Sequence, residues 1–383
     1  MVLHRMLLQS VQAMGKCGHL FVVTALLSIG ARAELVENLY QQSELVTGQS
    51  VAERQQATKQ ALAKVLVRVS GRALLLQSPA IESVLKSPQR FVEAYRYEST
   101  DEVIEQDGLP VPASRLVFNF SRAGIERLLR TQQAPLWPAN RPSVLVWLVK
   151  DDLSVGRELV SLQDGSELSA AASSLSELRG QPLVLPVLDL QDRLTISADQ
   201  VWSLDQAAII EASARYQADV LLVGRYSQTS NGSWLSTWTL LHKQHQQVFD
   251  RDTDREVDLV SQGLAATTDF LASIYSISSL GGDTGSVFLE VQRVNGFSGY
   301  VQLLSYLDSL EVVRQLDLVL LEEQTIHVKI KLEGEVHSLT DALELDRRLQ
   351  LVTSDGALPI ALPKQLEPLG SENNPLRYGW PSK

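Results

Sequence analysis

The sequence predicts a multidomain protein of mixed α/β and α+β class, and three observations support this prediction. The chain has 383 residues, enough for two or three domains at about 150 residues each. Apolar residues make up 44% of it, which is ordinary for a protein with packed cores. Helical and strand-like patterns alternate along it. We therefore expect a signal peptide (1–33), an α+β domain (34–137), an α/β domain with a mixed sheet (143–277), a ferredoxin-like domain (286–353) and a Pro-rich tail (354–383).

The first 33 residues have the pattern of a secretory signal peptide. Arg5 and Lys16 are positive, residues 20–30 are apolar without a charge, and Ala31-Arg32-Ala33 offers small residues to a signal peptidase. A membrane anchor is the alternative, but a spanning helix needs about 20 apolar residues, roughly twice the stretch present. We expect cleavage before Glu34 and a periplasmic location.

The only cysteine, Cys17, lies inside this segment. Lys16 precedes it, whereas a lipoprotein signal needs a small residue there, so we do not expect lipidation. Cleavage would leave a protein without disulfides, cysteine metal ligands or a thiol nucleophile. Both Met1 and Met14 are candidate start residues.

The charge of the chain bears on its partners. The formal net charge is −11, and loss of the basic leader would make it more negative. An acidic surface disfavours nucleic acid and anionic lipid headgroups as main partners. We expect an envelope protein or a cell-wall component as partner, no cofactor, and no transmembrane segment after cleavage.

The amino-terminal domain begins with a clear helix signal. Ser50-Val-Ala-Glu53 forms a capping box, and Gly71 is suited to end the helix that follows. Strands are predicted at 91–98 and 115–120, with a polar, acidic loop at 99–108 between them. A short helix follows, and the proline-containing segment 137–142 is predicted to be a linker.

The middle domain carries three apolar runs that do not alternate, which is typical of strands buried on both faces. They occupy residues 144–149, 183–188 and 219–224, although Pro186 weakens the second. Helices predicted between them favour parallel strands. The same reasoning places helices at 166–179, 204–216 and 257–274, and a strand at 234–242 after the turn at 230–233.

The last domain shows the order strand, helix, strand, strand, helix, which is typical of ferredoxin-like units. The elements lie at 287–291, 300–310, 312–321, 325–332 and 339–349, and a last strand can follow at 351–352. Five of the 14 prolines lie in the final 30 residues, so we expect an extended or disordered tail there.

Several stretches carry a resemblance to a known family: 57–72 (ATKQALAKVLVRVSGR), Trp137 with Arg141-Pro142, 144–147, 179–192 and 212–224. They resemble an uncharacterised family of exported γ-proteobacterial proteins, the domain-of-unknown-function family numbered two thousand and sixty-six. The resemblance covers nearly all of the mature chain and implies an envelope location, but it supplies no activity. The middle domain is also similar to the amino-terminal domain of TolB-type envelope proteins, which is a likeness of fold alone.

Polar residues follow the first two strands of the middle domain. In open α/β sheets, ligands bind beyond the carboxyl ends of the strands. If the two strands are neighbours, four carboxylates and one guanidinium meet at one edge, and they are candidates for ligand binding. The alternative is that they are ordinary polar loop residues. The residues are Asp151, Asp152, Asp189, Asp192 and Arg193.

Other motifs do not support an assigned catalytic residue or metal ligand. The alternating acids from Asp250 to Asp258 could bind Ca²⁺ on an extended segment, or could simply favour the start of the next helix. His242 and His245 are expected on opposite faces of one strand. The Asp-Thr-Gly-Ser at 283–286 has no second copy, and Gly-Phe-Ser-Gly at 296–299 is one residue short of a nucleophile elbow.

Two functional hypotheses follow. The first is an exported, non-enzymatic binding or assembly module of the cell envelope, based on the modular layout and acidic surface. The second is a periplasmic hydrolase or ligand-binding enzyme that uses the acidic edge of the middle domain.

Overall fold

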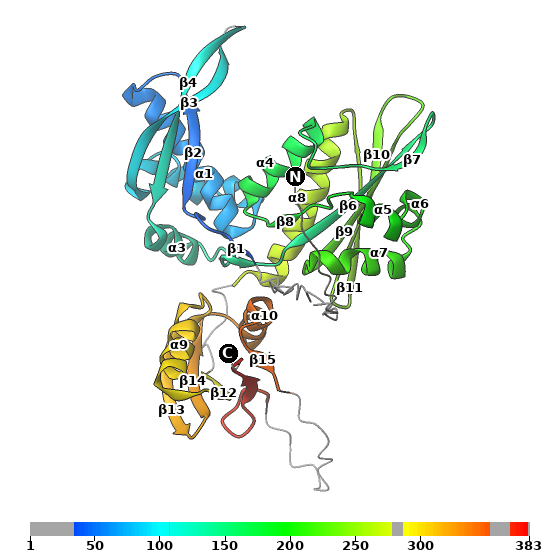
Figure 1. Cartoon of the computed structure of the whole chain (residues 1–383). Helices are drawn as coiled ribbons and strands as arrows, with labels where there is room; N and C mark the ends of the chain where they lie inside the picture. Colours follow the sequence, from blue (N-terminus) through cyan, green and yellow to red (C-terminus); the bar gives the residue numbers. More distant parts are fainter. Residues whose placement is uncertain (1–33, 107, 278–285, 353–367, 382–383) are drawn as a thin grey trace, which may run out of the picture. The chain divides into compact units, whose positions relative to one another are not determined.

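The computed structural model describes residues 34–106, 108–277, 286–352 and 368–381 (Figure 1). The predicted signal peptide and Asp283–Gly285 lie outside the described residues. The described chain forms four sheets, and the mixed α/β and α+β class predicted from the sequence is confirmed. We refer to residues 34–137, 143–277 and 286–381 as the amino-terminal, middle and carboxy-terminal regions. None of the described helices is long and apolar enough to cross a membrane.

The amino-terminal region packs helix α1 (Val51–Ser70) against one face of an antiparallel sheet ordered β2-β4-β3. The Ser50 side chain accepts a hydrogen bond from the Glu53 amide, and Gly71 ends the helix at φ 69°, as the sequence predicted. Around this core lie α2, at Pro79–Val84, and α3, at Arg122–Thr131. The strands are β2 (Gln41–Val46), β3 (Val92–Gln106) and β4 (Leu109–Phe120).

The predicted acidic loop at 99–108 is wrong. Strands β3 and β4 continue through it as a two-stranded ribbon, with a register shift between Ser99 and Val103. Figure 1 shows this ribbon extending past the helices of the region. Its residues are mostly exposed, so hydrogen bonds between the strands hold it rather than a core, and its polar composition looks like that of a loop.

The segment 137–142, which the sequence predicted to be a linker, is packed within the folded protein. Strand β5 (Asn140–Arg141) pairs with β1 (Glu34–Leu35), and Trp137 and Arg141 are fully buried. Its prolines restrict the backbone, and the packing of Trp137 and Arg141 holds the segment in one conformation.

The middle region contains a mixed six-stranded sheet in the order β11-β10-β9-β6-β7, with β8 also on β6. Strand β6 pairs in parallel with β8 and β9, which confirms the parallel arrangement. Strand β8 ends at Val184 instead of Leu188, because Pro186 has no amide hydrogen to donate. The strands are β6 (Val144–Asp152), β7 (Gly156–Leu159), β8 (Leu183–Val184), β9 (Val220–Gln228), β10 (Trp234–His242) and β11 (His245–Thr253).

Helices cover both faces of this sheet. One face packs against α4 and α8, and the other against α5, α6 and α7, with a separate cluster of buried apolar residues on each side. The helices are α4 (Glu167–Arg179), α5 (Leu190–Thr195), α6 (Ala198–Trp202), α7 (Gln206–Ser213) and α8 (Glu256–Tyr275).

The carboxy-terminal region has the predicted order of elements and one addition. Its sheet is ordered β13-β14-β12-β16-β15, and the added strand, β16, comes from the predicted Pro-rich tail. Strand β16 runs parallel to β12 and separates it from β15, so the sheet extends beyond the expected end at residue 353. The elements are β12 (Ser286–Gln292), α9 (Gly296–Ser309), β13 (Val313–Glu322), β14 (Thr325–Leu332), α10 (Val336–Asp346), β15 (Gln350–Leu351) and β16 (Leu376–Gly379).

Candidate functional site

The first part of the predicted acidic edge lies in the β6–β7 hairpin. One Asp152 oxygen accepts hydrogen bonds from the Ser154 amide at 2.8 Å and the Ser154 hydroxyl at 2.5 Å. These bonds lower the pKa of Asp152. Asp151 lies 3.6 Å from the Arg157 guanidinium. Both aspartates therefore have partners that shape the hairpin.

The second part is a hydrogen-bonded network around α5. Asp189 caps this helix by accepting from the Asp192 amide, and Arg215 binds both Asp189 oxygens. The hydrogen bonds from Arg215 lower the pKa of Asp189 to about 2. Asp192 is 1% exposed and accepts from the Leu188 amide, Arg215 and the Tyr216 hydroxyl. Arg193 donates a hydrogen bond to the Leu188 carbonyl.

Among the described residues, no hydrogen bond or ion pair joins these two parts. Val184, the last residue of β8, lies beside Leu145, six residues before Asp151 on β6. At about 3.3 Å per residue, Asp151 lies ~20 Å further along β6 than the point at which β8 ends. The two strands are neighbours, as the site hypothesis required, and the aspartates that follow them bind different arginines.

Neither of the other polar motifs forms a metal site in the described part of the chain, where no three His, Asp or Glu side chains are grouped to hold an ion. Asp250 and Asp252 lie on β11, while Glu256 and Asp258 are in the first turn of α8. His242 and His245 face each other across a tight hairpin, not on opposite faces of one strand. His242 contacts the Asp219 carbonyl at 3.0 Å and the Tyr275 hydroxyl at 2.6 Å.

A cleft of about 1020 Å³ lies over the face of the amino-terminal sheet that α1 does not cover. We call it the inter-region cleft. Its floor is formed by residues that lie opposite one another on neighbouring strands. Ser43 on β2, Val117 on β4 and Arg96 on β3 form one row, and Arg115 on β4 and Glu98 on β3 form a second row. These residues alternate with the buried side chains that face α1, so the exposed face of the sheet is polar.

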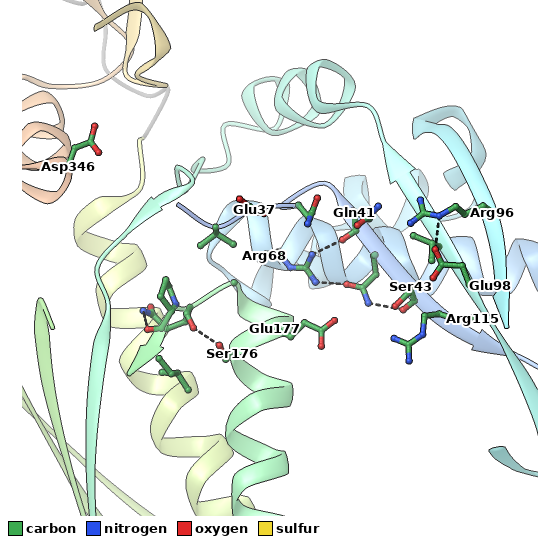
Figure 2. Close-up of a pocket in the computed structure, with 18 of the residues that line it drawn as sticks. Glu37, Gln41, Ser43, Arg68, Arg96, Glu98, Arg115, Ser176, Glu177 and Asp346 are labelled. Atoms are coloured by element: carbon green, nitrogen blue, oxygen red, sulfur yellow. Dashed lines mark hydrogen bonds and ion pairs between the residues drawn. The ribbon is translucent and has the colours of Figure 1, made fainter. Parts of the chain in front are cut away.

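The other walls of the inter-region cleft come from distant parts of the chain. The middle region supplies Ser176 and Glu177 at the end of α4, and the segment 180–183 that follows. The carboxy-terminal region supplies Asp346 and Arg348, and Glu37 of the amino-terminal region also lines the cleft. Figure 2 shows Glu177 directed from α4 toward the sheet residues Ser43 and Arg115.

The walls carry both signs of charge. Arg96 and Arg115 are about half exposed and pair with Glu98 and Glu102 on their own ribbon. Glu177 faces them from the opposite wall without an ion pair to any described residue. Exposed guanidinium and carboxylate groups bind partners with the complementary charge, and screening by salt limits each contact to modest strength.

Three buried arginines, which we call the arginine clamp, hold the walls in place. Helices α1 and α4 meet at their carboxyl ends, where unpaired carbonyl groups carry partial negative charge. Arg68 of α1 donates to the Leu178 carbonyl of α4 at 3.4 Å, and Arg179 of α4 donates to the Gly71 carbonyl beyond α1 at 2.9 Å. Each helix thus caps the other.

Arg141 completes the clamp. It is 0% exposed, and its hydrogen bonds to the described residues all go to main-chain carbonyls, those of Arg68, Trp137, Pro138, Arg179 and Gly180, at 2.7–3.1 Å. Its guanidinium also stacks over the Trp137 ring at 4.0 Å. Burial lowers the pKa of Arg141 to about 9, so the side chain stays charged at neutral pH.

Gly180 shows how closely the clamp is packed. It lies at φ 61°, where side chains are disfavoured, and a Cβ atom there would come within 2.9 Å of Arg141 Nη1 and 3.0 Å of Arg68 Cγ. Only glycine allows both arginines to reach the end of α4.

Residues 33–138 match the model of a family described as a domain of unknown function, DUF8605. No curated protein matches the chain. Among solved structures, the competence damage-inducible protein A (ComA) of Klebsiella pneumoniae subsp. pneumoniae MGH 78578 is 14% identical, covering 39% of this chain and 89% of its own, with a TM-score of 0.18.

The match shows that the amino-terminal region resembles a domain family without an assigned function. The likeness to the solved structure is too slight to carry an argument. The family expected from the sequence, its exported character and the likeness to TolB stay predictions.

Proposed function

We propose that the chain is an exported, non-enzymatic binding module of the bacterial cell envelope, and that it holds a polypeptide partner in the inter-region cleft. One observation carries the proposal: Arg96 and Arg115 on the sheet face Glu177 across a large polar cleft. Sites for small apolar ligands are usually 300–1,000 Å³ and lined mostly by apolar side chains. A polypeptide offers charges of both signs along its length and suits these walls better.

The arginine clamp supports the proposal because it fixes the distance between the walls before a partner arrives. A preorganised site avoids part of the entropic cost of binding. The acidic edge of the middle region gives no comparable support for a hydrolase, since Asp189, Asp192 and Asp152 are engaged in contacts within the protein.

Export is tested by the intact mass of the protein from a periplasmic extract. We expect a chain that begins at Glu34, because Ala31 and Ala33 occupy the positions read by the signal peptidase. A chain that keeps Cys17 in the membrane fraction would contradict export but not the cleft.

Binding is tested by a photo-crosslinking residue placed at Ser43 in cells, with Val248 on β11 as the control position. We expect crosslinks to a polypeptide from Ser43 alone, and their loss with Arg115→Glu or Glu177→Lys. Arg255→Glu, a charge reversal at an exposed residue outside the cleft, is the matched control. Equal crosslinking from both positions, or no effect of either reversal, would reject the cleft as the binding site.

A further inference from the structure

Strand β2 is an edge strand of the amino-terminal sheet, and among the described strands only β4 pairs with it. Residues of an antiparallel strand point their N–H and C=O groups alternately toward the neighbouring strand and away from it. The Tyr40 carbonyl accepts from the Phe120 amide at 2.9 Å, in line with the register of β2 on β4. Every second residue from Tyr40 therefore bonds to β4, whereas Gln41, Ser43 and Leu45 point their main-chain groups outward.

Some of these outward groups are already satisfied. The Gln41 carbonyl accepts from the Arg68 guanidinium at 2.8 Å, and the Ser43 carbonyl accepts from the Gln42 side-chain amide at 2.9 Å. The Gln41 amide bonds within the preceding turn. Among the described residues, no hydrogen bond reaches the Ser43 amide or either main-chain group of Leu45. Both residues are partly exposed, so these three groups are available to another strand.

The free edge of β2 opens into the inter-region cleft. Gln41 and Ser43 line the cleft, and so does Arg68, which bonds to the outward carbonyl of Gln41 (Figure 2). The end of α4 and the segment 180–183 form another wall of the same cleft. An extended segment placed beside β2 therefore lies within the cleft.

The two edges of the amino-terminal sheet are not equivalent. The other edge strand, β3, shifts register with β4 between Val92 and Ala94 and again between Ser99 and Val103. Bulges of this kind discourage an edge from pairing with a further strand. Strand β2 pairs with β4 without a shift along all six of its residues. Its edge is therefore regular enough to accept an added strand.

Charge specifies one side chain of such a strand. Residues that lie opposite each other on neighbouring strands place their side chains on the same face of the sheet. Ser43 lines the cleft, and Figure 2 shows the exposed Glu177 directed toward it from α4. A lysine or arginine opposite Ser43 thus points into the space that the Glu177 carboxylate faces.

We propose that the polypeptide partner binds as an added strand on β2, through main-chain hydrogen bonds to Ser43 and Leu45, with a basic side chain opposite Ser43. This inference rests on the proposed function and specifies how the partner is held. In strand addition, main-chain bonds give affinity and the alternate side chains give specificity. The arginine clamp sets where the added strand begins, because Arg68 occupies the edge at Gln41.

Short linear peptides selected on the mature protein from a phage-displayed library are the probe. We expect the selected peptides to share a lysine or arginine, and to lose affinity for Glu177→Lys. Ser43→Pro removes the outward N–H and keeps the bonds to β4, so calorimetry should show binding weakened about tenfold or more. Ser43→Ala keeps the N–H and is the matched control, with an affinity within about twofold of the wild type.

Amide hydrogen exchange, followed by NMR on the wild type, is a second measurement that does not depend on how Ser43→Pro folds. The Ser43 and Leu45 amides should exchange at least about tenfold more slowly when a selected peptide is bound, because both become donors to the added strand. Unchanged exchange at these two amides would overturn strand addition, as would equal affinity of the peptide for Ser43→Pro and wild type.

These outcomes are distinct from failure of the proposed function. Peptides that lose affinity for Arg115→Glu and Glu177→Lys, yet bind Ser43→Pro normally and protect neither amide, would leave the cleft as a binding site and reject the added strand. A library that yields no binding peptide, or peptides insensitive to both charge reversals, would overturn the cleft as a polypeptide site and strand addition with it.

Discussion

At the scale of single residues, Arg141 shows how main-chain carbonyls can hold a buried charge in place. Its guanidinium donors are all used by main-chain carbonyls, several of them at the carboxyl ends of α1 and α4. Those carbonyls have no partner within their own helices, so the arginine satisfies groups that would otherwise be buried and unpaired.

We predict that Arg141→Met lowers the free energy of unfolding by about 3 kcal/mol or more, because several buried carbonyls lose their donors at once. Urea denaturation measures the change. Arg255→Met, at an exposed arginine with one long ion pair of 4.0 Å, should change stability by less than about 0.5 kcal/mol. Similar stability for both variants would show that the clamp does not hold the regions together.

The network around α5 gives a second prediction. Asp192→Asn should destabilise the protein by roughly 1–3 kcal/mol, because the amide cannot accept all three hydrogen bonds that the buried carboxylate accepts. A functional site held at a cost in stability would behave in the opposite way and become more stable. Urea denaturation at neutral pH distinguishes the two cases, and increased stability would favour the ligand-site hypothesis for this edge.

The lowered pKa of Asp189 makes the stability of the folded protein depend on pH under acidic conditions. Its pKa is about 2 in the folded protein, below the ordinary value of 3.8, because Arg215 hydrogen bonds to the carboxylate. A carboxyl group with a lowered pKa stabilises the folded state above the unfolded pKa and loses this effect as pH falls through the folded value. The stability difference between wild type and Asp189→Asn should therefore be constant above about pH 5 and shrink between pH 4 and 2. Urea midpoints across this range measure it, and a difference that persists at pH 2 would contradict the assignment.

At the scale of elements, the β3–β4 ribbon extends beyond the core. Past Ser99 and Ser114 the paired residues are mostly exposed, so they contribute little buried apolar surface. Replacing residues 100–113 with Asn-Gly, which favours a two-residue hairpin turn, should change the free energy of unfolding by less than about 1 kcal/mol. Thermal or urea unfolding checks this, and a large loss would show that the ribbon supports the sheet over which the cleft lies.

At the scale of the whole molecule, the segment 137–142 behaves as part of the structure. Its prolines predicted a linker, but Trp137 and Arg141 are buried and the Trp137 amide donates to the Val69 carbonyl. We predict that limited proteolysis leaves 138–142 intact in the wild type and cuts there in Arg141→Met, as mass spectrometry of the fragments will show. Cleavage of the wild type at these residues would contradict the packing described.

The sequence by itself determined the local elements of this protein. The capping box at Ser50, the glycine that ends α1, and the apolar runs of the middle sheet predicted the correct elements, because caps and periodicity act over a few residues. The long ribbon was missed, since its strands are held by cross-strand bonds and carry the polar residues of a loop.

Only the tertiary structure decided which distant residues meet. Asp151 and Asp189 were expected at one edge if their strands were neighbours. The strands are neighbours, but Asp151 pairs with Arg157 and Asp189 pairs with Arg215. Arg68, Arg141 and Arg179 lie in three of the stretches that carry the family resemblance. Nothing in their spacing indicated that they meet where the carboxyl ends of α1 and α4 come together. Strand β16 likewise enters its sheet from a segment with a loop-like composition. Contacts of this kind depend on how helices and strands pack in space, and packing is decided by the whole chain at once.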